Sequence, residues 1–169
     1  MTTIIDFNLT QKMEVQENLK AFISKNKNNF IFPDNKWDDN IWNITSFLKN
    51  KIIDTKAKKV YFRSVRDNSL SKSSISISIS EPLVDFAKAI FCEIMRVKKL
   101  AEYKRIIYAI QALEFALIEQ KTSICVSEIN INTLNIAETY LRSKYKDPWN
   151  IAKNLESIIN NIVIKKQLN

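Results

Sequence analysis

The sequence predicts a mainly α-helical protein, in which a small α+β module with a short two-stranded sheet precedes a C-terminal four-helix bundle. Three observations lead to this fold class. Apolar residues recur at three- and four-residue spacing through most of the second half of the chain, as on one face of a helix. Two segments of the first half, 58–65 and 73–80, are rich in β-branched or aromatic residues, as strands are. Pro82 and Pro148 each follow an acidic residue, in the pattern that starts a helix.

The composition is that of a folded protein. The chain has 169 residues and a hydrophobic content of 46%, enough to bury a core as one domain or two small ones. We place a boundary near Ser80, with an α+β module over residues 1–80 and a helical bundle over residues 81–169. No window reaches the roughly 18 apolar residues of a membrane span, and the N-terminus lacks the features of a signal peptide. We therefore expect a soluble cytoplasmic protein with no membrane partner.

The N-terminal module is expected to contain two helices and two strands. Apolar residues over 13–23 predict an amphipathic helix, which the asparagine-rich KNKNNF would end. A second helix is predicted over Asp39–Lys49. KKVYFRSV at 58–65 is typical of a strand, and SSISISIS at 73–80 alternates isoleucine with serine, as the two faces of a strand do. These two segments would form a hairpin or a pair of edge strands, with a serine-rich linker as the alternative for 73–80.

The C-terminal half is expected to contain four helices. The first begins at Ser80–Pro82, where a capping serine, an acidic residue and a first-turn proline follow one another. The second is predicted over Tyr103–Glu119 and the third over about Asn132–Tyr145, with SICVSEIN at 123–130 between them as a strand or loop. Asp147–Pro148 starts the fourth. Their apolar stripes predict a shared core.

The residue types that are missing exclude several kinds of chemistry. The chain has no glycine, which removes glycine-rich phosphate loops, and no histidine, which removes histidine-based catalysis and metal binding. Cys92 and Cys125 stand alone and are expected to be small hydrophobic residues in a reduced compartment. Asp34, Asp38 and Asp39 do not have the spacing of a calcium loop. We expect no catalytic residue, no metal and no cofactor.

The basic residues form two clusters. With 26 Lys and Arg against 18 Asp and Glu, the net charge of +8 favours a polyanionic partner, although AT-rich coding, which enriches Ile, Asn and Lys, would give the same excess. Lys104 and Arg105 open a predicted helix, where the helix dipole disfavours cations, so they are the better candidates for function. The proposed nucleic-acid-binding residues are Lys98, Lys99, Lys104, Arg105, Arg142, Lys144 and Lys153. The secondary basic patch is Lys58, Lys59, Arg63 and Arg66, for which a solvated edge strand is the alternative.

The C-terminal half resembles a known family. EPLVDFAKAIFCEIMR, RIIYAIQALEFALIE and INTLNIAETYLRSKYKDPWNIAKNLESI are similar in order and pattern to the DNA-binding region that precedes the catalytic domain in phage-integrase-type tyrosine recombinases. The resemblance covers residues 81–169. The matching residues are Phe86, Ala87, Lys88, Ala89, Ala112, Leu113, Glu114, Ala116, Leu117, Ala137, Trp149, Leu155, Glu156 and Ile158.

The resemblance implies a SAM-like core-binding bundle that clamps one side of double-stranded DNA during integration and recombination. The catalytic set of that family includes a His-x-x-Arg element and lies in a separate domain, so this chain is expected to be a non-catalytic N-terminal segment of a longer recombinase or a truncated relative. Self-association on DNA is a further option. The alternative function is a helical protein-interaction module whose basic charge reflects genome composition.

Overall fold

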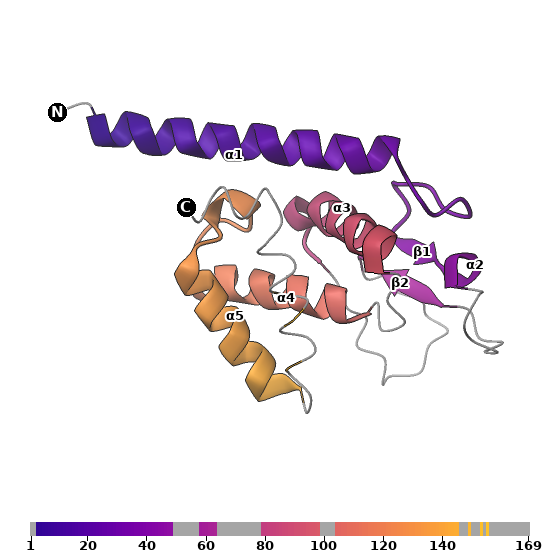
Figure 1. Cartoon of the computed structure of the whole chain (residues 1–169). Coiled ribbons are helices and arrows are strands. Elements are labelled where there is room, and N and C mark those ends of the chain that lie inside the picture. The colour runs from indigo at the N-terminus through magenta and orange to yellow at the C-terminus, as the bar shows by residue number, and fades with distance from the viewer. Residues whose placement is uncertain are drawn as a thin grey trace.

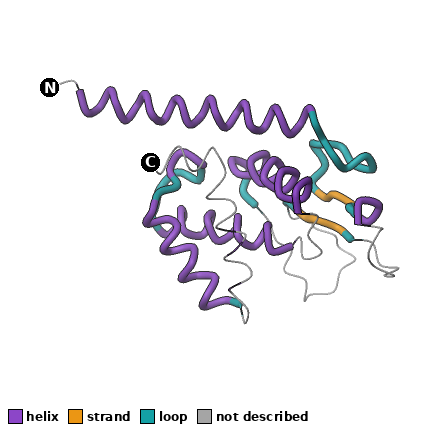
Figure 2. Tube along the Cα trace, viewed as in Figure 1, coloured by secondary structure: helices purple, strands orange, loops and turns teal. Residues whose placement is uncertain are grey.

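The computed structural model describes residues 3–48, 58–63, 79–98 and 104–145, together with residues 149, 153 and 155; side chains are described within these ranges except at 3–11 and 98. This part of the chain is mainly helical, with one antiparallel sheet of two short strands, as the sequence predicts (Figures 1 and 2). The helices are α1 (Thr3–Asn28), α2 (Thr45–Leu48), α3 (Glu81–Lys98), α4 (Lys104–Glu119) and α5 (Ile131–Lys144). The strands are β1 (Ile41–Asn43) and β2 (Lys59–Tyr61), and a 3-10 turn, η1, covers Val126–Glu128.

The first helix is longer than the sequence predicts. The helix expected over residues 13–23 lies within α1, and α1 ends inside the KNKNNF segment, as expected. Val15 and Phe22 are buried on its inner face, and its N-terminal turns extend past the other helices (Figure 1). Arg96 of α3 donates to the backbone oxygen of Asn29 at 3.1 Å and to the side chain of Asn26 at 3.3 Å, so α3 holds the C-terminal end of α1.

The helix predicted over Asp39–Lys49 is wrong. Ile41–Asn43 is strand β1, and among residues 39–48, which the structure describes, only Thr45–Leu48 is helical. Trp42 and Ile44 are both fully buried. Residues two positions apart share a face in a strand but lie on nearly opposite sides of a helix, so extended backbone is what lets both side chains enter the core.

The described partner of β2 is β1, a strand that the sequence did not predict. The strand expected at 58–65 is confirmed in part as β2, with Val60 buried and Lys59 exposed, but it pairs with β1, where Trp42 faces Val60. Most of the 73–80 segment lies outside the described residues. At its end, the N–H of Ile79 donates to the backbone oxygen of Phe62 at 2.9 Å, which places this point of the chain beside the end of β2.

Helix α3 is the central helix of the described structure. Every residue from Phe86 to Cys92 is buried, as expected for a helix covered on all sides. The side chain of Ser80, predicted to cap this helix, donates its hydroxyl hydrogen to Glu114 of α4, and the N–H of Ser80 donates to the same carboxylate at 3.1 Å. The start of α3 is therefore held by α4.

An aromatic cluster joins the N-terminal segment to α3. The ring centroids of Trp42 and Phe62 are 4.6 Å apart, and Phe62 lies 5.8 Å from Phe91 of α3. Phe32 contacts Phe91 as well, at 5.7 Å. These side chains belong to the same buried cluster as the inner faces of α3, α4 and α5, so the core is continuous across residue 80. The division of the chain at residue 80 stays a prediction.

Helices α4 and α5 match the prediction closely. The intervening segment 123–130 is a loop with the turn η1. Asn130 caps α5: its side chain accepts from the N–H groups of Asn132 and Thr133, and Thr133 accepts in return from the Asn130 N–H. After α4, Lys121 takes a left-handed conformation with φ of 55°. The hydrogen bonds Lys121 to Ile118 and Thr122 to Leu117 around it form a Schellman motif.

The predicted fourth helix lies largely outside the described residues. Trp149, Lys153 and Leu155 are helical, and Leu155 is buried while Trp149 is 66% exposed. In the part of the chain that the structure describes, no helix has both the length and the hydrophobicity of a membrane span.

Candidate nucleic-acid interface

Three contacts fix how α4 and α5 lie against each other. The rings of Tyr108 and Tyr145 stack with centroids 5.2 Å apart, and those of Phe115 and Tyr140 stack at 4.2 Å. At the opposite end, the side chain of Gln120 donates to Thr133 at 2.8 Å. As the residue number on α4 increases, the residue number of its contact partner on or beside α5 decreases, so the two helices are antiparallel. The N-terminus of α4 therefore lies at the same end of the pair as the C-terminus of α5.

This arrangement places four of the seven predicted binding residues at one end of the helix pair, although the side chains of Arg142 and Lys144, two positions apart on α5, point to nearly opposite sides of that helix. Lys104 and Arg105 occupy the first turn of α4, one turn before Tyr108, and Arg142 and Lys144 occupy the last turn of α5. We call these four residues the α4–α5 basic end. Lys104, Arg142 and Lys144 are exposed, and Arg105 is partly buried.

The cations of α5 are held in defined positions. The ammonium group of Lys144 donates to the phenol oxygen of Tyr140 and lies 4.9 Å from the centroid of the Tyr140 ring and 5.8 Å from that of Tyr145. Arg142 donates to Glu138 through Nε at 3.0 Å and through Nη2 at 2.5 Å. Exposed pairs of this kind contribute only about 0.2–1 kcal/mol, so a phosphate could replace Glu138 at little cost.

The other predicted binding residues are not placed at this end by any described contact. Lys98 closes α3, but its side chain lies outside the described part, as does all of Lys99. Lys153 is exposed, with its ammonium group 6.0 Å from the centroid of the Trp149 ring.

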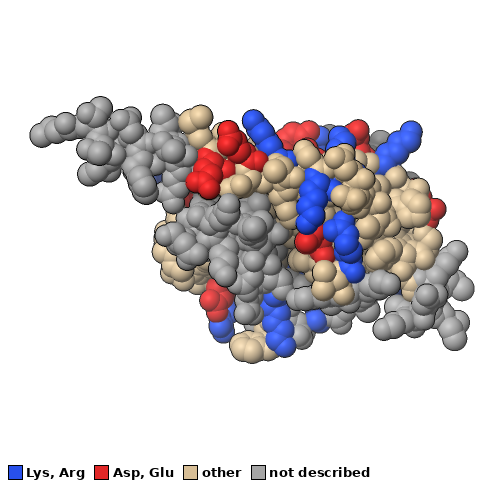
Figure 3. Space-filling view, turned by 45° about the horizontal axis from the view of Figure 1, so that its top comes forward, with Lys and Arg blue, Asp and Glu red and all other residues tan. Residues whose placement is uncertain are grey.

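The secondary basic patch is described at Lys58, Lys59 and Arg63, while Arg66 lies outside the described residues. Arg63 forms an ion pair with Glu81 at 2.7 Å, which links the end of β2 to the first turn of α3. On the face shown in Figure 3, Lys and Arg side chains are interspersed with Asp and Glu and do not form one positive area.

The structure also contains a buried lysine, Lys88, which the sequence singled out only as one of the residues that match the family. It is 3% exposed, and its ammonium group donates to the backbone oxygen of Trp37 at 2.6 Å. The group also lies 5.8 Å from the ring centroids of both Trp42 and Phe62. One turn earlier, Asp85 accepts from the indole N–H of Trp37 at 2.9 Å. Burial lowers the pKa of Lys88, and nearby acids, Asp85 first, partly oppose this.

The surroundings of Lys88 indicate a structural role. Its ammonium group binds the backbone oxygen of Trp37 and the carboxylate of Asp85 binds the indole N–H, so the two side chains anchor the N-terminal loop to α3. One sequence signal could have identified this lysine: it is the only charged residue in the apolar run from Phe86 to Cys92.

The described residues give no further site chemistry. Burial raises the pKa of the Cys92 thiol to about 12, which suits the predicted role as a small hydrophobic residue. Asp34 accepts from the Ser46 hydroxyl and Asp39 from the Lys36 N–H, as in an ordinary turn. Within the described ranges, no three Cys, Asp or Glu side chains gather as metal ligands would.

Comparison of the chain with protein-family models, with curated proteins and with solved structures finds no match. We therefore infer function from the geometry of the helices and their charged ends.

Proposed function

We propose that this chain binds duplex DNA without catalysing a reaction, and that the α4–α5 basic end makes its main phosphate contacts. One observation carries the proposal. The antiparallel pairing of α4 and α5 places Lys104 and Arg105 at the same end as Lys144, although they are about 40 residues apart in sequence. A cluster of cations from two elements can neutralise neighbouring phosphates and release their counterions.

Electrostatics within α4 supports the same proposal. The N-terminus of a helix carries partial positive charge, so Lys104 and Arg105 weaken the helix by a few tenths of a kcal/mol or more. A bound phosphate reverses the sign of this interaction, because it pairs with both cations and with the helix dipole. Lys144 is already positioned by Tyr140 and Tyr145, and so it loses little side-chain freedom when it meets a phosphate.

We further propose that α3, α4, α5 and a helix that contains Trp149, Lys153 and Leu155 form a SAM-like four-helix bundle of the tyrosine-recombinase core-binding type. The order of the described helices supports this. So does the burial of matching residues, since Phe86, Leu113, Leu117 and Leu155 all lie in the core. In this proposal the bundle clamps one side of the duplex, and a domain outside this chain performs recombination.

The proposal is tested by the double variant K104E/R105E. Fluorescence anisotropy of a labelled 30-base-pair duplex is measured at several salt concentrations. The wild-type protein is expected to bind more weakly as salt rises, and the variant should lose about two units from the slope of log K against log salt, since each phosphate contact contributes about 0.9. Glutamate in the first turn of a helix is favourable, so the variant should remain folded.

The matched control is K20E/K121E, which changes the net charge equally. Lys20 lies on α1, Lys121 follows the C-terminal end of α4, opposite the basic end, and both are exposed. The control is expected to keep most of the affinity. DNA binding that does not depend on salt, an absence of binding at low salt, or an equal loss in the control contradicts the proposal.

A further inference from the structure

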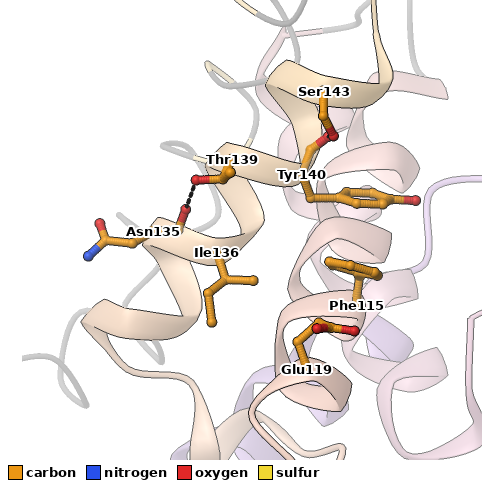
Figure 4. Close-up of a pocket in the computed structure, with 7 residues that line it drawn as sticks. All are labelled: Phe115, Glu119, Asn135, Ile136, Thr139, Tyr140 and Ser143. Atoms are coloured by element: carbon orange, nitrogen blue, oxygen red, sulfur yellow. Dashed lines mark hydrogen bonds between the residues drawn. The ribbon is translucent and has the colours of Figure 1, made fainter.

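A pocket of about 370 Å³ lies between α4 and α5, on the outer side of the pair. Figure 4 shows the rings of Tyr140 and Phe115 one over the other, the Glu119 carboxylate below them, and Ile136 facing the gap between the helices. Phe115, Ile136 and Tyr140 are only partly buried. Their apolar surface is therefore available to another molecule.

Two further apolar residues are exposed on the helices that form this pocket, which we call the α4–α5 groove. Ile118 lies one turn after Phe115 on α4 and is 52% exposed, and Ile131 opens α5 and is 67% exposed. Neither residue lines the pocket, so the contiguous apolar surface consists of Phe115, Ile136 and Tyr140. Exposed apolar residues that are contiguous mark interaction sites more often than isolated ones do.

The two hydroxyl groups at the rim of the pocket already donate hydrogen bonds within α5. Thr139 donates to the backbone oxygen of Asn135 at 2.9 Å, and Ser143 donates to that of Tyr140 at 2.8 Å. Their hydrogens are used within α5, so an apolar side chain can lie against this rim without leaving a donor unpaired. The groove is therefore suited to aliphatic or aromatic groups.

Glu119 favours a positively charged group on the molecule that binds in the groove. It is exposed, it is the one charged side chain that lines the pocket, and it forms no ion pair within the described part of the chain. It also ends α4, where the helix dipole disfavours a carboxylate. A carboxylate at this position repels phosphate and attracts an ammonium or guanidinium group, which favours a protein over a nucleic acid as the occupant.

We propose that the α4–α5 groove docks an amphipathic helix of a partner protein. Apolar side chains of that helix would pack against Phe115, Ile136 and Tyr140, and a Lys or Arg beside them would pair with Glu119. A third helix in the groove of a helix pair is a common recognition mode, with anchor residues three and four positions apart. The groove shares Tyr140 with the α4–α5 basic end, because the Lys144 ammonium group lies over the Tyr140 ring, whereas Glu119 and Ile136 belong to the groove alone.

Two synthetic amphipathic peptides test the proposal on the full chain. Both carry leucine at positions i, i+3, i+4 and i+7; one has lysine beside the leucines, and the other has glutamate at the same positions. Titration calorimetry and amide chemical-shift mapping are the measurements. The lysine peptide should bind and shift the amides of residues 115–119 and 135–143, and the glutamate peptide should bind more weakly.

Variants make the outcome specific to the groove. E119Q should weaken binding of the lysine peptide by about two- to fivefold, the effect of one exposed ion pair. E119K should reverse the preference between the two peptides. The matched control is E17Q, at an exposed position on α1. It should change neither the affinity for the lysine peptide nor the preference between the two peptides. Binding of neither peptide at about 1 mM, equal binding of both, or shifts confined to other residues overturns the proposal.

A further variant separates the groove from the DNA site. I136E should abolish peptide binding while leaving the salt-dependent DNA affinity unchanged, with circular dichroism confirming that the helices remain. Loss of DNA affinity in I136E with unchanged peptide binding would contradict the assignment of the groove to a protein partner.

Discussion

At the scale of single residues, the environment of a charged side chain decides its role. Lys88 and Lys144 both lie near aromatic rings, but Lys88 is buried against the backbone oxygen of Trp37 and Lys144 is exposed. The first is therefore a structural anchor and the second a candidate for binding an anion. Sequence alone grouped charges by position along the chain, and it could not separate these two cases, because burial depends on which segments pack together.

Lys88 makes folding stability depend on pH. Burial lowers its pKa below the usual 10.5 in the folded state, so the unfolded chain binds this proton more readily. This contribution to stability is present above the unfolded pKa of about 10.5 and is lost as pH falls through the lower pKa of the folded state. We expect K88M to remove this part of the pH dependence, as measured by urea unfolding between about pH 7 and pH 10.

Two variants, K88M and K88A, separate the effect of the buried charge from the effect of side-chain size. K88M keeps the volume and removes the buried charge, so it should change the free energy of unfolding at neutral pH by no more than about 1–2 kcal/mol. K88A leaves a cavity and should cost about 2–4 kcal/mol. An unchanged pH dependence in K88M would show that Lys88 is not desolvated in the folded protein.

At the scale of elements, patterns within one segment predicted α3, α4 and α5 better than they predicted β1. The 3.6-residue period of α3, α4 and α5 is a local property, and Leu113, Leu134 and Leu141, which belong to the apolar stripes of these helices, are buried. The strand β1 escaped prediction because three residues become a strand only when a partner, β2, supplies the hydrogen bonds. Burial of both Trp42 and Ile44 follows the two-residue period that could have indicated it.

At the C-terminus of α4 a lysine occupies a position that glycine usually occupies in other proteins. Lys121 adopts a left-handed conformation that glycine adopts without steric strain. We expect K121G to raise the free energy of unfolding by about 1 kcal/mol, because it removes the strain of the side-chain carbon. The control is K121A, which loses the same charge but keeps that carbon and should gain little. Chemical denaturation of the three proteins is the measurement, and equal stability of K121G and K121A would contradict the explanation.

At the scale of the whole molecule, the continuous core couples the N-terminal segment to the helices. Trp42 and Phe62 contact Phe91 in the middle of α3, and Lys88 and Asp85 fix Trp37. Removal of either part would expose large aromatic surfaces of the other. The boundary predicted at residue 80 from a change of sequence pattern therefore coincides with a change of element type, while the packing extends across it.

This coupling predicts a single unfolding transition. In a W149F background, the fluorescence of Trp37 and Trp42 reports on the N-terminal segment, and circular dichroism at 222 nm reports mainly on the helices. Both signals should change at the same denaturant concentration, as in a two-state protein. A tryptophan transition that clearly precedes the loss of helix would mean that the N-terminal segment unfolds separately.

The sequence by itself determined the helical class, the positions of α3, α4 and α5, and the choice of Lys104 and Arg105 as cations that oppose a helix dipole. Each of these depends on residues close together in the chain. Only the tertiary structure decided that Lys144 joins them, that β1 pairs with β2, and that Lys88 is buried. The physical reason is that stacking, strand pairing and desolvation depend on contacts between distant segments, which a local pattern does not specify.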